Sequence, residues 1–160
     1  ADALPSLRSK KSLDLFEKYN VLNNRELKAR VDILEEQYIT NKEIEARTLL
    51  SMMNTQIIPA AEVYQFELAK TLNEVSTALS KTVNGIQLKK LQEVTDLISC
   101  TLASLEKLEK EEKKELTTEK VRDSLIPLME EIRLNSDALE GILPDELWPI
   151  PKYSEMLFLI

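Results

Sequence analysis

The feature that most constrains the fold of this chain is one helical pattern about sixty residues long, from Asn24 to Val83. The run holds no glycine, and its only proline is Pro59. At 1.5 Å per residue it would extend roughly 90 Å, so we expect a spine along which other helices pack. Apolar or small residues recur along it in steps of three and four: Ala46, Leu49, Met53, Ile57, Ala60, Tyr64, Leu68, Thr71, Val75 and Ala78.

Two prolines fall inside predicted helices, Pro59 and Pro127. Because proline lacks an N–H and crowds the carbonyl four residues earlier, we expect helix kinks at both. The apolar stripe keeps its phase across Pro59, which favours a kink there over an end. Both prolines follow an isoleucine, but the flanking sequences do not align, so coincidence is favoured over a duplication. Thr40 and Asn41, two poor helix formers, mark another place where the spine could break.

The whole chain, residues 1–160, reads as one all-α domain, an antiparallel helical bundle. Asn84-Gly85 is the clearest helix-ending signal, and Gly141 is another. The prolines near the C-terminus favour an extended path there. The predicted segments are a strap plus a short helix capped by Ser12 (1–22), the long kinked helix (24–83), helices at 86–115 and 118–140, and an extended C-terminal segment (144–160).

The C-terminal segment is the densest apolar patch of the chain. Left exposed it would promote aggregation, so we expect it to pack on this domain's helices or on a neighbour. The residues predicted to form this interface are Trp148, Pro149, Pro151, Tyr153, Leu157, Phe158 and Ile160.

The sequence argues against most catalytic chemistry. It has no histidine, and its two glycines stand apart, so a histidine base and a glycine-rich phosphate loop are both excluded. Neighbouring glutamates such as Glu111-Glu112 point about 100° apart on a helix and do not converge on a metal. Cys100, the one cysteine, lies in an apolar run and is expected to be a buried thiol. We predict no catalytic, cofactor-binding or metal residue.

Charge and hydropathy limit the classes of partner that this chain is expected to bind. The formal net charge of −7 disfavours nucleic acid, and the most basic cluster, Arg8, Lys10 and Lys11, is short. No apolar run approaches the eighteen or so residues of a membrane span. Since the chain begins at Ala1, we expect it to be part of something longer.

Several stretches stand in order along the whole chain: Ala1–Pro5; Leu15–Tyr19 with Val21-Leu22, Arg25–Leu27 and Arg30; Gln56–Ala60 with Tyr64-Gln65; Ile126–Glu130 with Arg133; and Trp148–Tyr153 with Leu157-Phe158. Together they resemble the C-terminal part of type III glutamine synthetases. Asn20 stands where that family tends to have glycine, and Val31 where it tends to have an aromatic residue.

The resemblance implies a cytoplasmic parent enzyme of nitrogen metabolism, a ligase that makes glutamine from glutamate, ammonia and ATP with Mg or Mn. It also implies that the partners are an upstream catalytic domain and the other subunits of a ring-shaped homo-oligomer. None of the family's nucleotide, metal or glutamate motifs matches this stretch, so no catalytic residue is carried over. The expected role is subunit contact or bracing of the catalytic ring.

Two other readings remain open at this point. Long kinked helices with few glycines also suit a stand-alone signalling or adaptor bundle. A divalent-metal bundle enzyme is the third reading, although such enzymes usually place histidine three residues after glutamate, and this chain has none.

Overall fold

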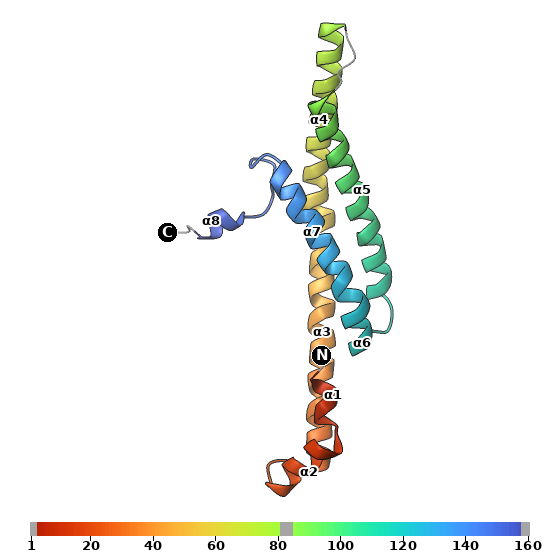
Figure 1. Cartoon of the computed structure of the whole chain (residues 1–160), viewed down its shortest axis with the longest axis vertical. Helices are drawn as coiled ribbons and strands as arrows, with labels where there is room; N and C mark the ends of the chain where they lie inside the picture. The colour runs from red at the N-terminus through yellow and green to blue at the C-terminus, as the bar shows by residue number, and fades with distance from the viewer. Residues whose placement is uncertain (1–2, 81–84, 158–160) are drawn as a thin grey trace.

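The chain folds into an elongated helical rod (Figure 1). The structure, a computed structural model, describes residues 3–80 and 85–157. Every regular element within these ranges is a helix, which confirms the predicted all-α class. One helical spine runs the length of the rod, and the later helices fold back along it.

The spine consists of α3 (Asn24–Met52), a π-helical turn η1 (Met53–Ile57) and α4 (Ile58–Leu79). It begins with a capping box: the Glu26 N–H donates to the Asn23 side chain at 2.9 Å, and the Asn23 N–H donates to the Glu26 carboxylate at 2.8 Å. α3 passes through Thr40-Asn41 without a break, because its neighbours there pack against the core and stabilise the helix.

Both mid-helix prolines follow a π-helical turn. The Ile58 N–H donates to the carbonyl of Met53, five residues back, directly before Pro59. A second π turn, η2 (Val121–Leu125), stands directly before Ile126-Pro127. A π turn holds one residue more than an α turn, which gives room for the proline ring. The expected disturbance therefore takes the form of a widened turn, and Figure 1 shows α4 continuing α3 without a sharp bend.

Two further helices complete the bundle. α5 (Ile86–Glu112) runs antiparallel to the spine, and α6 (Thr118–Lys120), η2 and α7 (Ile126–Ile142) return across it (Figure 1). The core lies where α7 crosses the spine and α5. It includes the buried side chains Ala46, Met53, Ile57, Ile58, Ala61, Tyr64, Val94, Ile98, Leu105, Leu108, Val121, Leu125, Ile132, Leu139, Leu143 and Trp148.

The N-terminal strap is more helical than predicted. Residues before Ser12 form α1 (Leu4–Leu7) and the start of α2 (Lys10–Lys18), which is capped by Ser9 instead of Ser12. Pro5 suits the first turn of α1 because its missing N–H would have no helical partner there. Arg8 then ties this end to α3 through ion pairs of 2.6 and 2.7 Å with Asp32 and Glu35.

Asn20 ends the turn after α2 with a φ of +51°. This left-handed conformation favours glycine, and asparagine is among the few other residues that tolerate it. The conformation explains why a position at which the resembling family tends to have glycine can hold asparagine here.

The remaining boundaries differ from prediction at four places. α5 ends at Glu112, three residues before its predicted end at residue 115. α4 ends at Leu79, where Ser80 takes a φ of +51°, and the predicted end at Val83 lies outside the described residues. α7 runs through Gly141 and ends at Ile142, because Pro144 forces the residue before it into an extended conformation. The segment predicted to be extended contains a short helix, α8 (Tyr153–Leu157).

Replacing Asn23 with alanine should lower the free energy of unfolding by about 1 kcal/mol, because the capping box loses its acceptor. For a chain of this size that corresponds to a loss of about 2–4 °C in Tm, measurable by circular dichroism. Asn73→Ala is the matched control, since Asn73 is an exposed position inside α4. That variant should be neutral or slightly stabilising, because alanine has the higher helix propensity. Equal losses in both variants would contradict the capping role.

Candidate interaction surface

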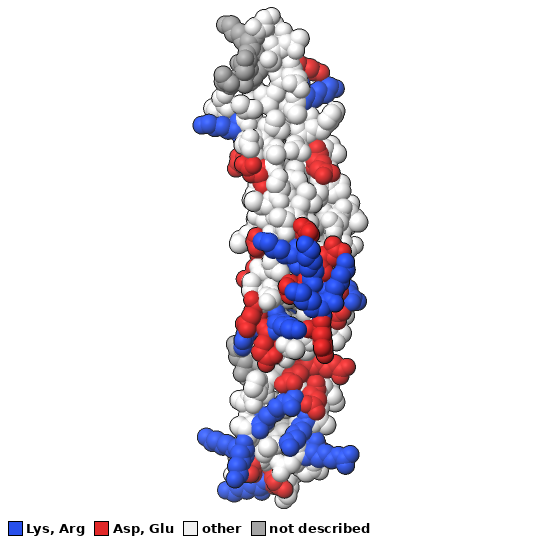
Figure 2. Space-filling model, turned by 90° about the vertical axis from the view of Figure 1, so that its right-hand side faces the viewer, with Lys and Arg blue, Asp and Glu red and all other residues white. Residues whose placement is uncertain are grey.

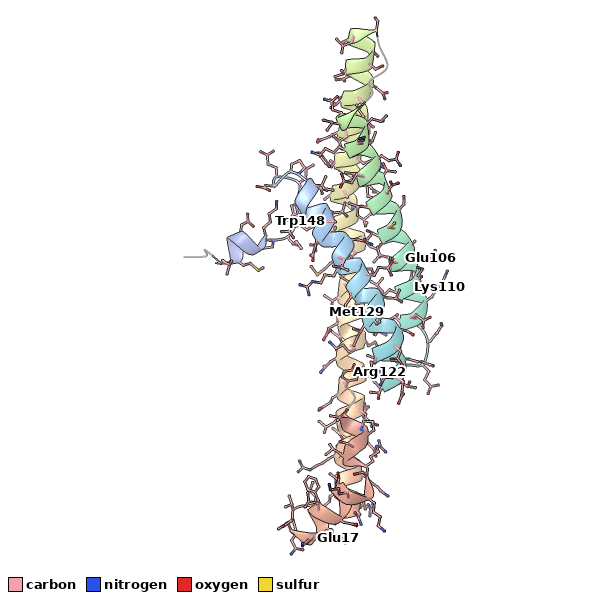
Figure 3. The ribbon with its side chains drawn as sticks, viewed as in Figure 1. Glu17, Glu106, Lys110, Arg122, Met129 and Trp148 are labelled. Carbon is pink, nitrogen blue, oxygen red and sulfur yellow. The ribbon has the colours of Figure 1, made fainter. Side chains whose placement is uncertain are left out.

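The C-terminal segment is anchored by Trp148, which is only 7% exposed and belongs to the core. Leu147 and Ile150 pack against the same cluster. The Trp148 and Leu147 N–H groups donate to the carbonyl of Pro144 and so form a tight turn after α7. Figure 3 places Trp148 beside α7. Trp148 therefore fixes the start of the segment to its own domain.

We call residues 149–157 the arm. Ile150 near its start still packs against the core, and among the described residues the arm leaves the bundle after it. Figure 1 shows α8 standing away from the rod. Pro149 and Pro151 are exposed, as are Met156 at 50% and Leu157 at 77%. Of the other predicted interface residues, Tyr153 begins α8, and Phe158 and Ile160 lie outside the described residues. The interface role of these residues stays a prediction.

A groove lies between the spine and α7, near the base of the arm. It encloses about 460 Å³, and Ile150 forms part of its wall. Its other apolar walls include Leu49, Met52, Ile126 and Met129, and Lys42 and Arg133 are among its polar residues. Helical periodicity could not reveal this groove, because its walls come from three distant parts of the sequence.

Ion pairs cover the C-terminal end of α5. Lys110 pairs with Glu106 at 2.5 Å, and Lys113 with Glu109 at 2.6 Å. The hydrogen bond from Lys110 lowers the pKa of Glu106, and the hydrogen bond to Glu109 raises the pKa of Lys113. Figure 2 shows the two charges mixed over this part of the rod, and Figure 3 shows Glu106 and Lys110 on its outer side. These exposed pairs contribute little stability and form a solvated face.

Basic residues gather at the opposite end of the rod from the α4–α5 connection, where α2 turns into α3 (Figure 2). We call this the basic end and define it by Lys10, Lys11, Lys18, Arg25, Lys28 and Arg30. In the part of the chain that the structure describes, none of the six forms an ion pair. Most other cations of the rod are paired with carboxylates, so this end holds uncompensated positive charge.

Apolar side chains are exposed among these cations. Leu15, Tyr19 and Val21 are each more than half exposed, and they lie on α2 and the turn after it. Next to them Arg25 and Lys28 line a shallow groove of about 480 Å³ on α3. Exposed aromatic residues and arginine are both enriched at protein contact surfaces, and this end presents both.

Within residues 3–80 and 85–157, no three histidine, cysteine, aspartate or glutamate side chains gather as metal ligands would. Cys100 is exposed, so the expectation of a buried thiol is wrong. The inward positions beside it on α5 are Ile98 and Thr101, and the thiol lies off their face. None of the described helices is long and apolar enough to cross a bilayer.

Fold and surface therefore define an all-helical domain with an exposed apolar arm and a basic end. Comparison with known proteins shows what it is similar to. Residues 1–76 match the sequence model of the glutamine synthetase C-terminal domain. The chain is 33% identical to the type-3 glutamine synthetase of Dictyostelium discoideum over 169 aligned residues, which cover 99% of the chain and 23% of that protein.

Two bacterial glutamine synthetases are also similar to this chain. The one from Bacteroides fragilis is 29% identical across 86% of the chain, and the one from Butyrivibrio fibrisolvens is 26% identical across 98%. The resemblance seen in the sequence is thereby confirmed: residues 1–76 match the glutamine synthetase C-terminal domain, and nearly the whole chain is similar to a type-3 glutamine synthetase. It spans less than a quarter of the length of the relatives that it matches.

Proposed function

We propose that this domain serves contact between subunits of a type-3 glutamine synthetase, or braces its catalytic ring. The parent polypeptide would make glutamine from glutamate and ammonia with ATP and Mg or Mn, using residues outside this chain. An upstream catalytic domain and other subunits of a ring-shaped oligomer would be its partners. The observation that carries the proposal is the arm, which exposes Met156 and Leu157 away from its own bundle. Apolar side chains presented in this way are usual where another surface covers them.

The test changes the arm and leaves its anchor intact. Met156→Asp combined with Leu157→Asp places charges on the exposed arm, while Trp148 and the core stay as they are. In the full polypeptide we expect association at least tenfold weaker, seen as a smaller mass by light scattering at micromolar concentration.

Leu134→Asp is the matched control, because Leu134 is an exposed leucine on α7 outside the arm. It should leave the oligomer mass unchanged. An unchanged mass for the arm variant, with the same helical circular dichroism, would contradict the proposed contact.

A further inference from the structure

The charge of this chain is divided unevenly between its two ends. Residues 1–30 hold seven Lys and Arg against four Asp and Glu, in a chain whose net charge is −7. Residues 126–157, which form α7 and the C-terminal segment, hold seven Asp and Glu against two Lys and Arg. The first group includes the basic end. The second includes the arm, which itself holds one cation, Lys152, and one carboxylate, Glu155, so the acidic excess lies on α7 and in the turn before the arm.

We propose that the arm of one copy of this chain binds the basic end of a second copy. The inference rests on the proposed role of the arm in subunit contact and names the surface that receives it. Both surfaces expose apolar side chains, Met156 and Leu157 on the arm and Leu15, Tyr19 and Val21 on the basic end.

Charge complementarity supports this pairing, because carboxylates outnumber cations in the helix end and turn that lead into the arm. The carboxylates of Glu140 and Glu146 lie at the C-terminal end of α7 and in the turn after it. Arg25 and Lys28 line the shallow groove of the basic end and have no ion pair among the described residues. Opposite charges around an apolar centre give an interface both orientation and fast association, and like-charged faces of the rod would repel.

The contact joins two copies because one copy cannot make it alone. α3 has 29 residues and is about 44 Å long. The basic end lies at the start of α3, whereas the arm stands level with the far end of α3 in Figure 1. The arm is too short to fold back over that length, since its nine residues, 149–157, span at most about 32 Å when fully extended.

The two faces of this contact differ, so it is a head-to-tail interface. Such an interface does not stop at a dimer: the pair still has one free arm and one free basic end, and the assembly closes into a ring or grows open. Assembly size should therefore depend on both protein concentration and ionic strength, because exposed charges are screened beyond about 8 Å at physiological salt.

The test is a charge exchange in the full polypeptide, followed by sedimentation velocity at low and high salt. Arg25→Glu with Lys28→Glu reverses the charge of the basic end. Glu140→Lys with Glu146→Lys reverses the charge at the end of α7 and in the turn before the arm. Each reversal alone should weaken association at least tenfold at low salt. The two together should restore it to within about threefold, because the opposite charges face each other again.

Lys70→Glu with Lys89→Glu is the matched control. It changes the net charge by the same amount at exposed positions on α4 and α5, far from the basic end, and should leave association unchanged. Failure of the exchanged pair to restore association, or equal weakening by the control, would overturn the inference.

The outcomes separate this inference from the proposed function. If charging Met156 and Leu157 disrupts the oligomer and reversing the basic end does not, the arm is a subunit contact with another receiving surface, and only the inference fails. If neither the arm variant nor the basic-end reversal weakens association, the proposed function and the inference both fail. Loss of binding to a DNA duplex or to phosphatidylserine vesicles on reversing the basic end, without any change in self-association, would assign that end to a different anion and also overturn the inference.

Discussion

Replacing Leu139 with alanine should lower the free energy of unfolding by about 2–5 kcal/mol. Leu139 lies on α7, is fully buried and belongs to the core where α7 crosses the spine. The loss combines the transfer free energy of the removed atoms with the cost of the cavity they leave, since tightly packed helices relax only in part. For a chain of this length the expected drop in Tm is about 5–15 °C by calorimetry.

The same helix supplies the control for this measurement. Leu134 is 69% exposed, so Leu134→Ala removes the same atoms from a site that already faces water. Its effect should stay within about 0.5 kcal/mol. Similar Tm losses in the two variants would mean that α7 does not pack on the spine as the structure has it.

The helices were predictable because their signals are local and periodic. The capping box at Asn23 and the spacing of Met53, Ile57 and Tyr64 depend only on neighbours within one or two turns. The start of α5 at Ile86 likewise follows from the glycine before it. An all-α bundle with a long spine therefore follows from the sequence.

The sequence predicts a disturbed helix at each proline, but it does not predict that the disturbance is a π turn. Proline forbids one hydrogen bond, and a chain can respond with a kink, a break or a widened turn. Which response occurs depends on the packing of the turn before the proline. Met53 and Ile57 in η1, and Val121 and Leu125 in η2, are all buried in one core, so a wide turn that keeps them inward is favoured over a bend. The two Ile-Pro sites thus share a local solution to the same steric problem.

The candidate surfaces were predictable only in part, because they depend on tertiary contacts. The apolar C-terminal segment is visible in the sequence, but the inward position of Trp148 and the outward position of Leu157 are not. The basic end is harder still to find. Lys10 and Lys11 look like a short cluster until α2 folds back and brings them to the same end of the rod as Arg25 and Lys28.

Replacing Trp148 with alanine should detach the arm from its domain. Burial of this one indole accounts for about 3–5 kcal/mol, and the segment after Pro144 is otherwise held by few buried side chains. Because few buried side chains hold this segment to the bundle, it can open without unfolding the bundle. Trypsin should therefore cut after Lys152 at least tenfold faster, which mass spectrometry of timed samples would measure, since each 1.4 kcal/mol lost raises the open population tenfold.

Trp148→Phe is the control, because it keeps an aromatic ring at the anchor position and removes only the indole N–H and part of the ring system. Among the described residues, the buried indole N–H finds no hydrogen-bond acceptor, so phenylalanine keeps most of the apolar contact and removes an unpaired donor. We expect it to cost less than about 1.5 kcal/mol and to leave the cleavage rate near that of the unchanged chain. Rapid cleavage in both variants would show that the aromatic contact is not what holds the segment. Slow cleavage in both variants would show that residues after Trp148 hold the arm on the bundle. That result would contradict an arm that stands free of its own bundle.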